Sequence, residues 1–252
     1  MIRFAAGIAI MAGVVYLLAC LALFLSQRSF IFYPQPRSFG NADSVIKMKV
    51  PNAELTVSSR RLAGPGAVIY FGGNAEDVSG SLPTLAEAFP KHALYLMHYR
   101  GYGGSSGKPS QAAVFADALA MFDQLHAQHP NITLIGRSLG SGVAVYLASV
   151  RPAVRLVLVT PYDSLGELAA RRFPMFPVSF LLTDTFESWR YAPLITVPTT
   201  LVAASDDEVI PRSSSKLLFT RFKPGVARWV DIPRSGHNTL SDHPAYAQAL
   251  QP

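Results

Sequence analysis

Cysteine is almost absent from this sequence. The single thiol in 252 residues, Cys20, lies inside an apolar N-terminal segment, so the rest of the chain has neither a disulfide nor a thiolate metal site. The sequence also lacks a His-Glu-x-x-His pattern and clustered carboxylates, which are common sources of metal ligands. The glycines of 101–107 do not have the spacing of a dinucleotide-binding or phosphate-binding loop. We therefore expect no metal and no cofactor.

Charged residues are also scarce. They make up 15 % of the chain, against 50 % for hydrophobic residues. The net charge of +6 arises without a long run of lysine and arginine, so the sequence has no pattern for binding nucleic acid. A solvated basic surface accounts for the excess positive charge, and attraction to anionic lipid headgroups is the alternative.

The N-terminus holds most of the apolar excess. Phe4–Ser26 is nearly continuously apolar and carries no charge, between Arg3 and Arg28. A helix of about 20 residues can cross a bilayer core, whereas a cleaved signal peptide has an apolar core of about 7–15 residues. We predict a single-pass membrane anchor at residues 1–27, with a lipoprotein modified at Cys20 as the alternative. The basic residues on the two sides of the run favour opposite orientations, which leaves the orientation open.

Beyond the anchor, the chain predicts one α/β domain. Residues 28–43, with aromatic residues beside two prolines, predict a stiff juxtamembrane linker, and residues 44–252 form the domain. Strands are expected at 44–50, 54–62, 67–71, 93–98, 132–135, 155–160, 200–204 and 227–232, and helices at 79–89, 111–128, 139–149, 213–221 and 240–250. Strands that alternate with helices predict a mostly parallel sheet with helices on both faces.

The central motif of this domain is Gly136-Arg-Ser138-Leu-Gly140, between a short apolar strand and a helix. Such a strand-to-helix turn lifts a serine out of the sheet, and glycines flank it because larger side chains would clash. This spacing alone is weak evidence for a nucleophile, so the surrounding sequence has to support it. A nucleophilic serine also requires an acid and then a histidine later in the chain. Both follow here, and Ser138 is the predicted nucleophile.

Three acids compete for the role of orienting the histidine. Asp206, Asp207 and Glu208 follow the apolar strand at 200–204 and precede a helix. The acid of such a triad holds the imidazole in one tautomer and stabilises its cationic form. We favour Asp207, with Asp206 as the alternative. The acids that are not used would be solvated or helix-capping carboxylates.

His237 is the predicted general base. It follows the strand at 227–232 in a loop with Gly236, just before the last predicted helix. In that position a histidine can take a proton from a serine and return it to the leaving group. His243 is the rival, but it lies next to Pro244 at the start of the helix.

An oxyanion hole would complete the site. The amide of Leu139 directly follows the nucleophile at a helix N-terminus, where backbone amides are free to donate. The second predicted donor is the amide of Asn74, after the strand at 67–71. Gly72 and Gly73 precede it, and Gly73 would let the backbone approach the substrate oxygen.

Together these residues resemble the α/β-hydrolase fold family, and within it the small membrane-anchored serine hydrolases that include depalmitoylating thioesterases. The resemblance extends from the anchor and Phe32-Tyr-Pro34 almost to the C-terminus. It includes Gly-Asn-Ala at 73–75, Tyr-Arg-Gly-Tyr-Gly at 99–103, Gly-x-Ser-x-Gly, Asp-x-Val-Ile-Pro at 207–211, and Gly-His. The match at 207–211 selects Asp207 over Asp206. The sequence departs from the family pattern at Gly72, which replaces a histidine, and at His98, which replaces an aspartate.

The segment between the strand at 155–160 and the acid is where such enzymes insert a lid. Residues 164–192 are too few for a large cap domain, so we predict a minimal cap. Its apolar side chains either pack on the core or line an acyl pocket that faces the bilayer, with Phe176 and Phe180 as the predicted contacts.

The sequence thus predicts a membrane-anchored serine hydrolase that cleaves esters or thioesters, with lipids or acylated proteins as the favoured substrates. A serine peptidase that uses the same residues is one alternative. The other is a membrane-bound scaffold that keeps the fold without catalysis.

Overall fold

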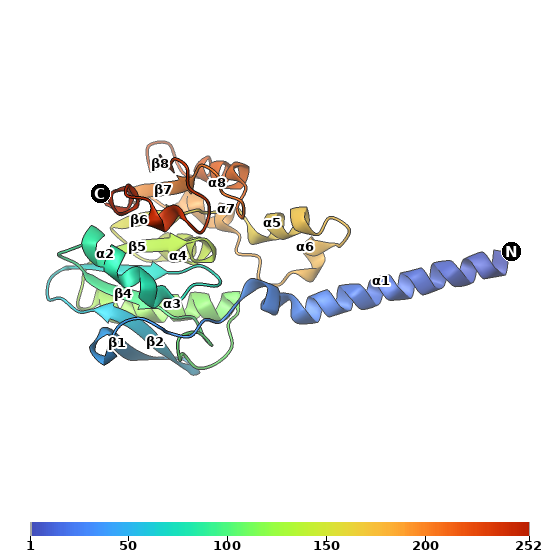
Figure 1. Ribbon diagram of the computed structural model, residues 1–252, viewed down its shortest axis with the longest axis horizontal. Coiled ribbons are helices and arrows are strands. Elements are labelled where there is room, and N and C mark those ends of the chain that lie inside the picture. Colours follow the sequence, from blue (N-terminus) through green and yellow to red (C-terminus); the bar gives the residue numbers. More distant parts are fainter. Residues whose placement is uncertain (1, 252) are drawn as a thin grey trace.

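The computed structural model describes residues 2–251, an α/β domain from which one long N-terminal helix projects (Figure 1). The strands are β1 Val45–Val50, β2 Ala53–Arg60, β3 Gly66–Phe71, β4 Ala93–Met97, β5 Asn131–Arg137, β6 Arg155–Val159, β7 Thr199–Ala204 and β8 Ala227–Ile232. The α-helices are α1 Ile2–Ile31, α2 Leu82–Ala88, α3 Gln111–His126, α4 Leu139–Val150, α5 Leu165–Arg172, α6 Val178–Leu181, α7 Ser188–Tyr191, α8 Arg212–Phe219 and α9 Tyr246–Leu250.

The strands form one eight-stranded sheet in the order β1-β2-β4-β3-β5-β6-β7-β8. β2 pairs antiparallel with β1 and β4, while the strands from β4 through β3 to β8 are parallel. The carboxyl ends of the parallel strands therefore lie at one edge, where ligands bind in open α/β sheets. This arrangement confirms the predicted α/β fold and its mostly parallel sheet.

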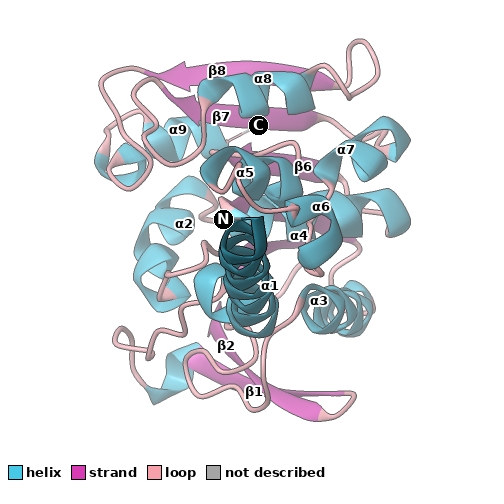
Figure 2. Ribbon diagram, turned by 90° about the vertical axis from the view of Figure 1, so that its right-hand side faces the viewer, coloured by secondary structure: helices cyan, strands magenta, loops and turns pink. Residues whose placement is uncertain are grey.

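Helices cover both faces of this sheet (Figure 2). Along β3, Ala67, Ile69 and Phe71 belong to one hydrophobic cluster, which also contains buried residues of α3 and α4. The alternate residues Val68 and Tyr70 belong to a second cluster with residues of α2 and α9. Successive side chains of a strand point to opposite faces, so an apolar run such as β3 must be covered on both sides.

α1 differs from every other element because most of its side chains are exposed. It is long and apolar enough to cross a bilayer, and an 18-residue window of it has a mean hydropathy of 2.7, a property that signal sequences share. The helix extends four residues beyond the predicted anchor, to Ile31. The chain then enters the domain, where Phe32 is buried against Phe186.

The C-terminal helix is shorter than predicted. The sequence indicated one helix over 240–250, whereas the structure has a 3-10 turn at Leu240–Asp242 and then α9. Pro244 lies between them, and proline disfavours helical backbone at the residue before it. The predicted cap at 164–192 forms the short helices α5, α6 and α7.

Candidate active site

Ser138 occupies a tight turn between β5 and α4. Its backbone has φ 49° and ψ −118°, a strained conformation for a residue with a side chain. A Cβ atom added at Gly136 would lie 2.3 Å from the Gly140 carbonyl oxygen, and one at Gly140 would lie 2.0 Å from that of Phe71. Neither position accepts a side chain, which is the steric reason for the glycine spacing.

The structure brings the predicted serine, histidine and acid together. The His237 Nε2 atom is 2.9 Å from the Ser138 hydroxyl oxygen, and both Asp207 carboxylate oxygens are 3.0 Å from His237 Nδ1. The residues come from three separate strand ends, after β5, β7 and β8. Ser138 and His237 are 9 % and 5 % exposed, so little water competes for these hydrogen bonds.

The two adjacent aspartates have different surroundings. Asp207 Oδ1 also accepts the amides of Val209 at 3.0 Å and Ile210 at 2.7 Å, which fix the carboxylate toward the histidine. Asp206 is exposed and accepts the Ser205 hydroxyl instead. Geometry therefore selects Asp207 as the partner of the histidine.

Glu208 and His243, the other candidates for the acid and the base, have other hydrogen-bond partners. Glu208 accepts the backbone amide of His237 at 2.9 Å, so it holds the histidine loop instead of being simply solvated. The rival His243 accepts the amide of Ala245 through Nδ1, a local contact at the start of α9.

The loop after β3 places Asn74 beside the serine. Its carbonyl oxygen accepts the Tyr33 amide at 3.0 Å and the Tyr102 hydroxyl at 2.6 Å. Among residues 2–251, no hydrogen bond engages the Asn74 amide. A Cβ atom at Gly73 would lie 3.7 Å from that of Ser138, so this loop runs directly past the serine. A Cβ atom at Gly72 would lie 2.4 Å from the Val78 side chain, so a larger residue there would require Val78 to move.

A largely buried polar cluster around Glu76 supports this loop, and no sequence motif indicated it. The Glu76 carboxylate accepts the Gly73 amide at 2.8 Å and the hydroxyls of Tyr70 and Ser81, each at 2.7 Å. It lies 3.4 Å from the Arg137 guanidinium, and Arg137 also donates to the His237 carbonyl oxygen at 3.3 Å. The pair thus links the loop after β3, the serine turn and the histidine loop. Arg137 occupies a variable position of the serine motif, so the spacing does not specify it.

His98 lies below the loop that follows β4, away from the serine. Its Nε2 atom is 2.9 Å from the Ser58 hydroxyl oxygen, and it is almost fully buried. Burial lowers the pKa of His98 from 6.5 to about 4, because a cation there would lose its hydration. The ring is therefore neutral at pH 7 and supports the loop through its hydrogen bond.

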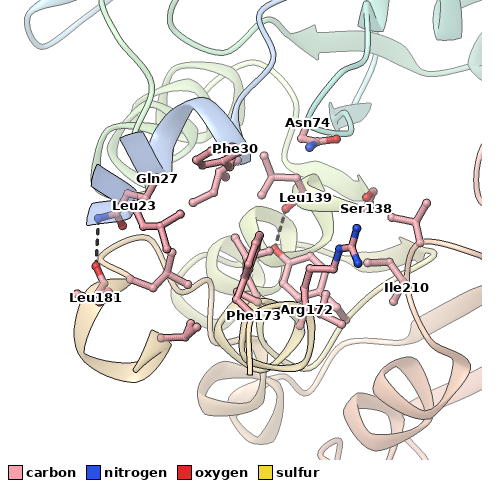
Figure 3. Close-up of a pocket in the computed structure, with 18 of the residues that line it drawn as sticks. Leu23, Gln27, Phe30, Asn74, Ser138, Leu139, Arg172, Phe173, Leu181 and Ile210 are labelled. Atoms are coloured by element: carbon pink, nitrogen blue, oxygen red, sulfur yellow. Dashed lines mark hydrogen bonds between the residues drawn. The ribbon is translucent and has the colours of Figure 1, made fainter. Parts of the chain in front are cut away.

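An apolar cavity of about 660 Å³ lies in front of Ser138, bounded by α1, the cap and the loop after β7 (Figure 3). Ser138, Leu139 and Asn74 lie at its inner end, and Arg172 is its one basic lining residue among those that the structure describes. The outer wall is apolar and comes from α1 and the cap, with Leu23, Phe30, Phe173, Phe176, Leu181 and Leu182.

Of the two cap residues that were predicted to contact substrate, one lines the cavity and the other does not. Phe176 lines the cavity, as predicted. Phe180 does not line it and is 87 % exposed, so its placement in the pocket was wrong. The two residues are four apart, but α6 begins between them at Val178 after Pro177, which turns Phe180 outward. The sequence patterns also did not predict that α1 contributes to the cavity wall.

Comparisons with known proteins agree with this architecture. The sequence model of the alpha/beta hydrolase fold matches residues 66–184. An uncharacterized protein of Mycobacterium tuberculosis is 34 % identical over 229 residues, which cover 84 % of this chain and 80 % of that protein. The chain belongs to the α/β-hydrolase family. The alpha/beta hydrolase domain-containing protein aho-3 of Caenorhabditis elegans is 32 % identical to this chain. The aligned residues cover 73 % of this chain and 56 % of aho-3.

Solved structures of α/β-hydrolases have the same fold. The esterase Pf2001 of Pyrococcus furiosus superimposes with a TM-score of 0.67 and 20 % identity, covering 86 % of this chain and 98 % of the esterase. The enol-lactonase of Burkholderia xenovorans superimposes with a TM-score of 0.64 and 16 % identity, covering 81 % and 98 % of the two chains. At these identities the neighbours show that this α/β-hydrolase shares their fold.

Proposed function

We propose that this chain is a serine hydrolase of carboxylic esters or thioesters, anchored in a membrane by α1. One observation carries the proposal. The Ser138 hydroxyl lies 2.9 Å from His237 Nε2, and His237 Nδ1 lies 3.0 Å from Asp207, at the inner end of an apolar cavity. These distances are within the hydrogen-bonding range that a nucleophile, its base and an orienting acid require.

In the first half-reaction, the Ser138 oxygen attacks the substrate carbonyl carbon while His237 Nε2 takes the hydroxyl proton. Asp207 keeps the imidazole in the tautomer whose Nε2 can accept that proton, and it stabilises the resulting cation. When the tetrahedral intermediate collapses, His237 gives the proton to the leaving alcohol or thiol. The acyl group then remains on Ser138 as an ester.

In the second half-reaction, water repeats the attack. His237 takes a proton from a water molecule, whose oxygen attacks the acyl carbon, and then returns the proton to Ser138 as the carboxylic acid leaves. In both halves, negative charge develops on the carbonyl oxygen. The amides of Asn74 and Leu139 are the proposed donors to it, because both residues lie beside Ser138 at the cavity's inner end.

The shape of the cavity favours an acyl chain over a polar group as the part of the substrate that is bound. Its outer wall consists of leucine and phenylalanine side chains, so burial of a hydrocarbon chain there gains hydrophobic free energy. Part of that wall belongs to α1, the proposed anchor. A lipid or an acylated protein at the membrane would present such a chain.

The adjacent aspartates provide a matched test. Asp207→Asn should lower the turnover of a p-nitrophenyl ester by about 10⁴-fold, the size of effect known for the triad acid of a serine protease. Asp206→Asn removes the same charge one residue away and should leave turnover within about twofold, because the Asp206 carboxylate accepts the Ser205 hydroxyl and not the histidine. Equal losses in the two variants, or full activity in Asp207→Asn, would contradict the assigned roles.

A further inference from the structure

Part of the cap runs along the outside of α1. We use the name cap segment for residues 173–182, between the end of α5 and the end of α6. The Tyr16 hydroxyl of α1 donates to the Met175 carbonyl oxygen at 2.9 Å, and Gln27 donates to that of Leu181 at 3.1 Å. The Tyr16 ring also stacks on Phe176, with centroids 5.8 Å apart and planes 3° apart. Figure 1 places α5 and α6 near the end of α1 that joins the domain, and Figure 2, which looks along α1, shows both helices next to it.

These contacts fix how far the cap segment extends along α1. From Gln27 back to Tyr16 the helix rises by about 16 Å, at 1.5 Å per residue. The uncharged part of α1 lies between Arg3 and Arg28. If the hydrocarbon core ended before Tyr16, only the residues from Phe4 to Val15 would remain for it, about 18 Å of helix. A bilayer core is about 30 Å thick, so a bilayer crossed by this run must extend past Tyr16, to the depth of the cap segment.

The cap segment has the composition that such a depth requires. It carries no charged residue, and the side chains of Met175 and Phe180 are 80 % and 87 % exposed. Charges return at its two ends, with Arg172 before it and Asp184 shortly after it. Arg28 pairs with Asp184 at 2.9 Å, so the uncharged parts of α1 and of the cap end at the same level.

Most backbone amides of the cap segment are hydrogen-bonded, which suits a medium without water, in which unpaired polar groups are costly. Pro174 and Pro177 have no N–H group to satisfy. The amides of Phe173, Phe176 and Val178 donate to carbonyl oxygens within the cap, at 2.8, 3.1 and 2.8 Å. The carbonyl oxygens of Met175 and Leu181 accept the side chains of α1 described above.

We propose that the cap segment is immersed in the same leaflet that α1 crosses, and that the cavity in front of Ser138 opens into the hydrocarbon of that leaflet. The acyl chain of a membrane-resident ester then enters sideways, between α1 and the cap, without leaving the lipid. Leu23 and Phe30 of α1 and Phe176 of the cap form the walls of this entrance. This inference rests on the proposed function for the anchoring role of α1 and for the ester substrate.

The depth of single side chains in a bilayer tests the inference. Because Cys20 is the only cysteine, a Cys20→Ser chain can carry one nitroxide label at a time. Met175→Cys and Phe180→Cys report on the cap segment, Val14→Cys on α1, and Val154→Cys on the loop before β6, at the edge of the sheet opposite the carboxyl ends of the strands. All four side chains are at least 40 % exposed, so the substitutions remove little packing. The labelled full-length chains are reconstituted in phosphatidylcholine vesicles, and collision with oxygen and with a water-soluble nickel chelate is measured.

The expected result is an oxygen-to-nickel collision ratio at positions 175 and 180 that matches the ratio at position 14 and exceeds the ratio at position 154 several-fold. A water-exposed ratio at 175 and 180, with position 14 in lipid, would overturn the immersion of the cap and leave the anchor intact. A water-exposed ratio at position 14 as well would overturn the anchor itself. Labels at 175 and 180 shielded from both reagents would mean that another polypeptide covers the segment, which also contradicts the proposal. None of these readings requires turnover, so they are independent of the chemistry proposed for Ser138.

Discussion

At the scale of single residues, the candidate site depends on backbone strain and on buried polar contacts. Ser138 is held at positive φ by a turn that leaves no room for a side chain at Gly136 or Gly140. Glu76 and Arg137 join the three loops around it through one largely buried ion pair. Such pairs fix geometry because either partner alone would leave an unpaired charge out of water. The site is therefore positioned before any substrate binds.

Burial of His98 makes the stability of the protein depend on pH. Its pKa falls from 6.5 in an exposed chain to about 4 in the folded protein. Between these values the unfolded chain binds a proton that the folded protein excludes, so the free energy of unfolding falls as the pH falls. The stabilisation is complete above pH 6.5, and its loss amounts to about 3 kcal/mol by pH 4.

The check is a series of denaturant titrations of the detergent-solubilised chain from pH 7 to 4, with His98→Gln as the control. The glutamine keeps a polar contact to Ser58 but cannot titrate. Between pH 7 and 4, the free energy of unfolding of the variant should therefore fall by about 3 kcal/mol less than that of the wild type. Parallel curves for the two proteins would contradict the neutral, buried state of His98.

At the scale of elements, α1 has more than one contact with the domain. Beyond its apolar surface, Gln27 bonds the cap at Leu181 and Thr183, and Arg28 pairs with Asp184. The chain that follows α1 reaches the site itself, because the Tyr33 amide holds the Asn74 carbonyl oxygen. A backbone hydrogen bond thus joins the chain after the proposed anchor to the loop that holds Asn74, the proposed oxyanion donor. α1 also forms part of the cavity wall.

Phe176 lines the cavity and Phe180 lies outside it, so the two residues form a matched pair. Phe176→Ser removes apolar wall from the cavity and should lower kcat/KM for long-chain esters about tenfold, which corresponds to about 1.4 kcal/mol of lost contact. Short-chain esters do not reach this wall and should be spared. Phe180→Ser should leave the chain-length preference unchanged in detergent micelles, because Phe180 lies outside the cavity. Equal losses on long and short esters in Phe176→Ser would contradict the acyl-pocket interpretation.

At the scale of the whole molecule, the parts of the fold set by local pattern could be predicted. The apolar runs at 67–71 and 155–159 and the glycines around Ser138 specify a strand or a turn within a few residues of sequence. The order serine, acid, histidine then required only that the carboxyl ends of parallel strands meet at one edge. The choice of Asp207 over Asp206 came from the family resemblance and agrees with the hydrogen bonds.

What could not be predicted depends on segments that are far apart in sequence. Tyr16 and Met175 are separated by 159 positions, so no local periodicity reports their contact. The same holds for the contact between Glu76 and Arg137, because Glu76 lies outside the matched motifs and Arg137 occupies a position where the serine motif allows any residue. Phe180 was misplaced because apolar composition alone does not distinguish a side chain in a cavity from one on an outer surface.

Labelling with a fluorophosphonate probe tests the central claim, that His237 and Asp207 activate Ser138 as a nucleophile. The probe phosphonylates an activated serine, so the full-length chain in membranes should be labelled, and Ser138→Ala should lose the signal while keeping its expression and melting temperature. Retention of the signal in Ser138→Ala would mean that another residue reacts. A well-folded wild-type chain that stays unlabelled would contradict the account and indicate a hydrolase fold kept for binding.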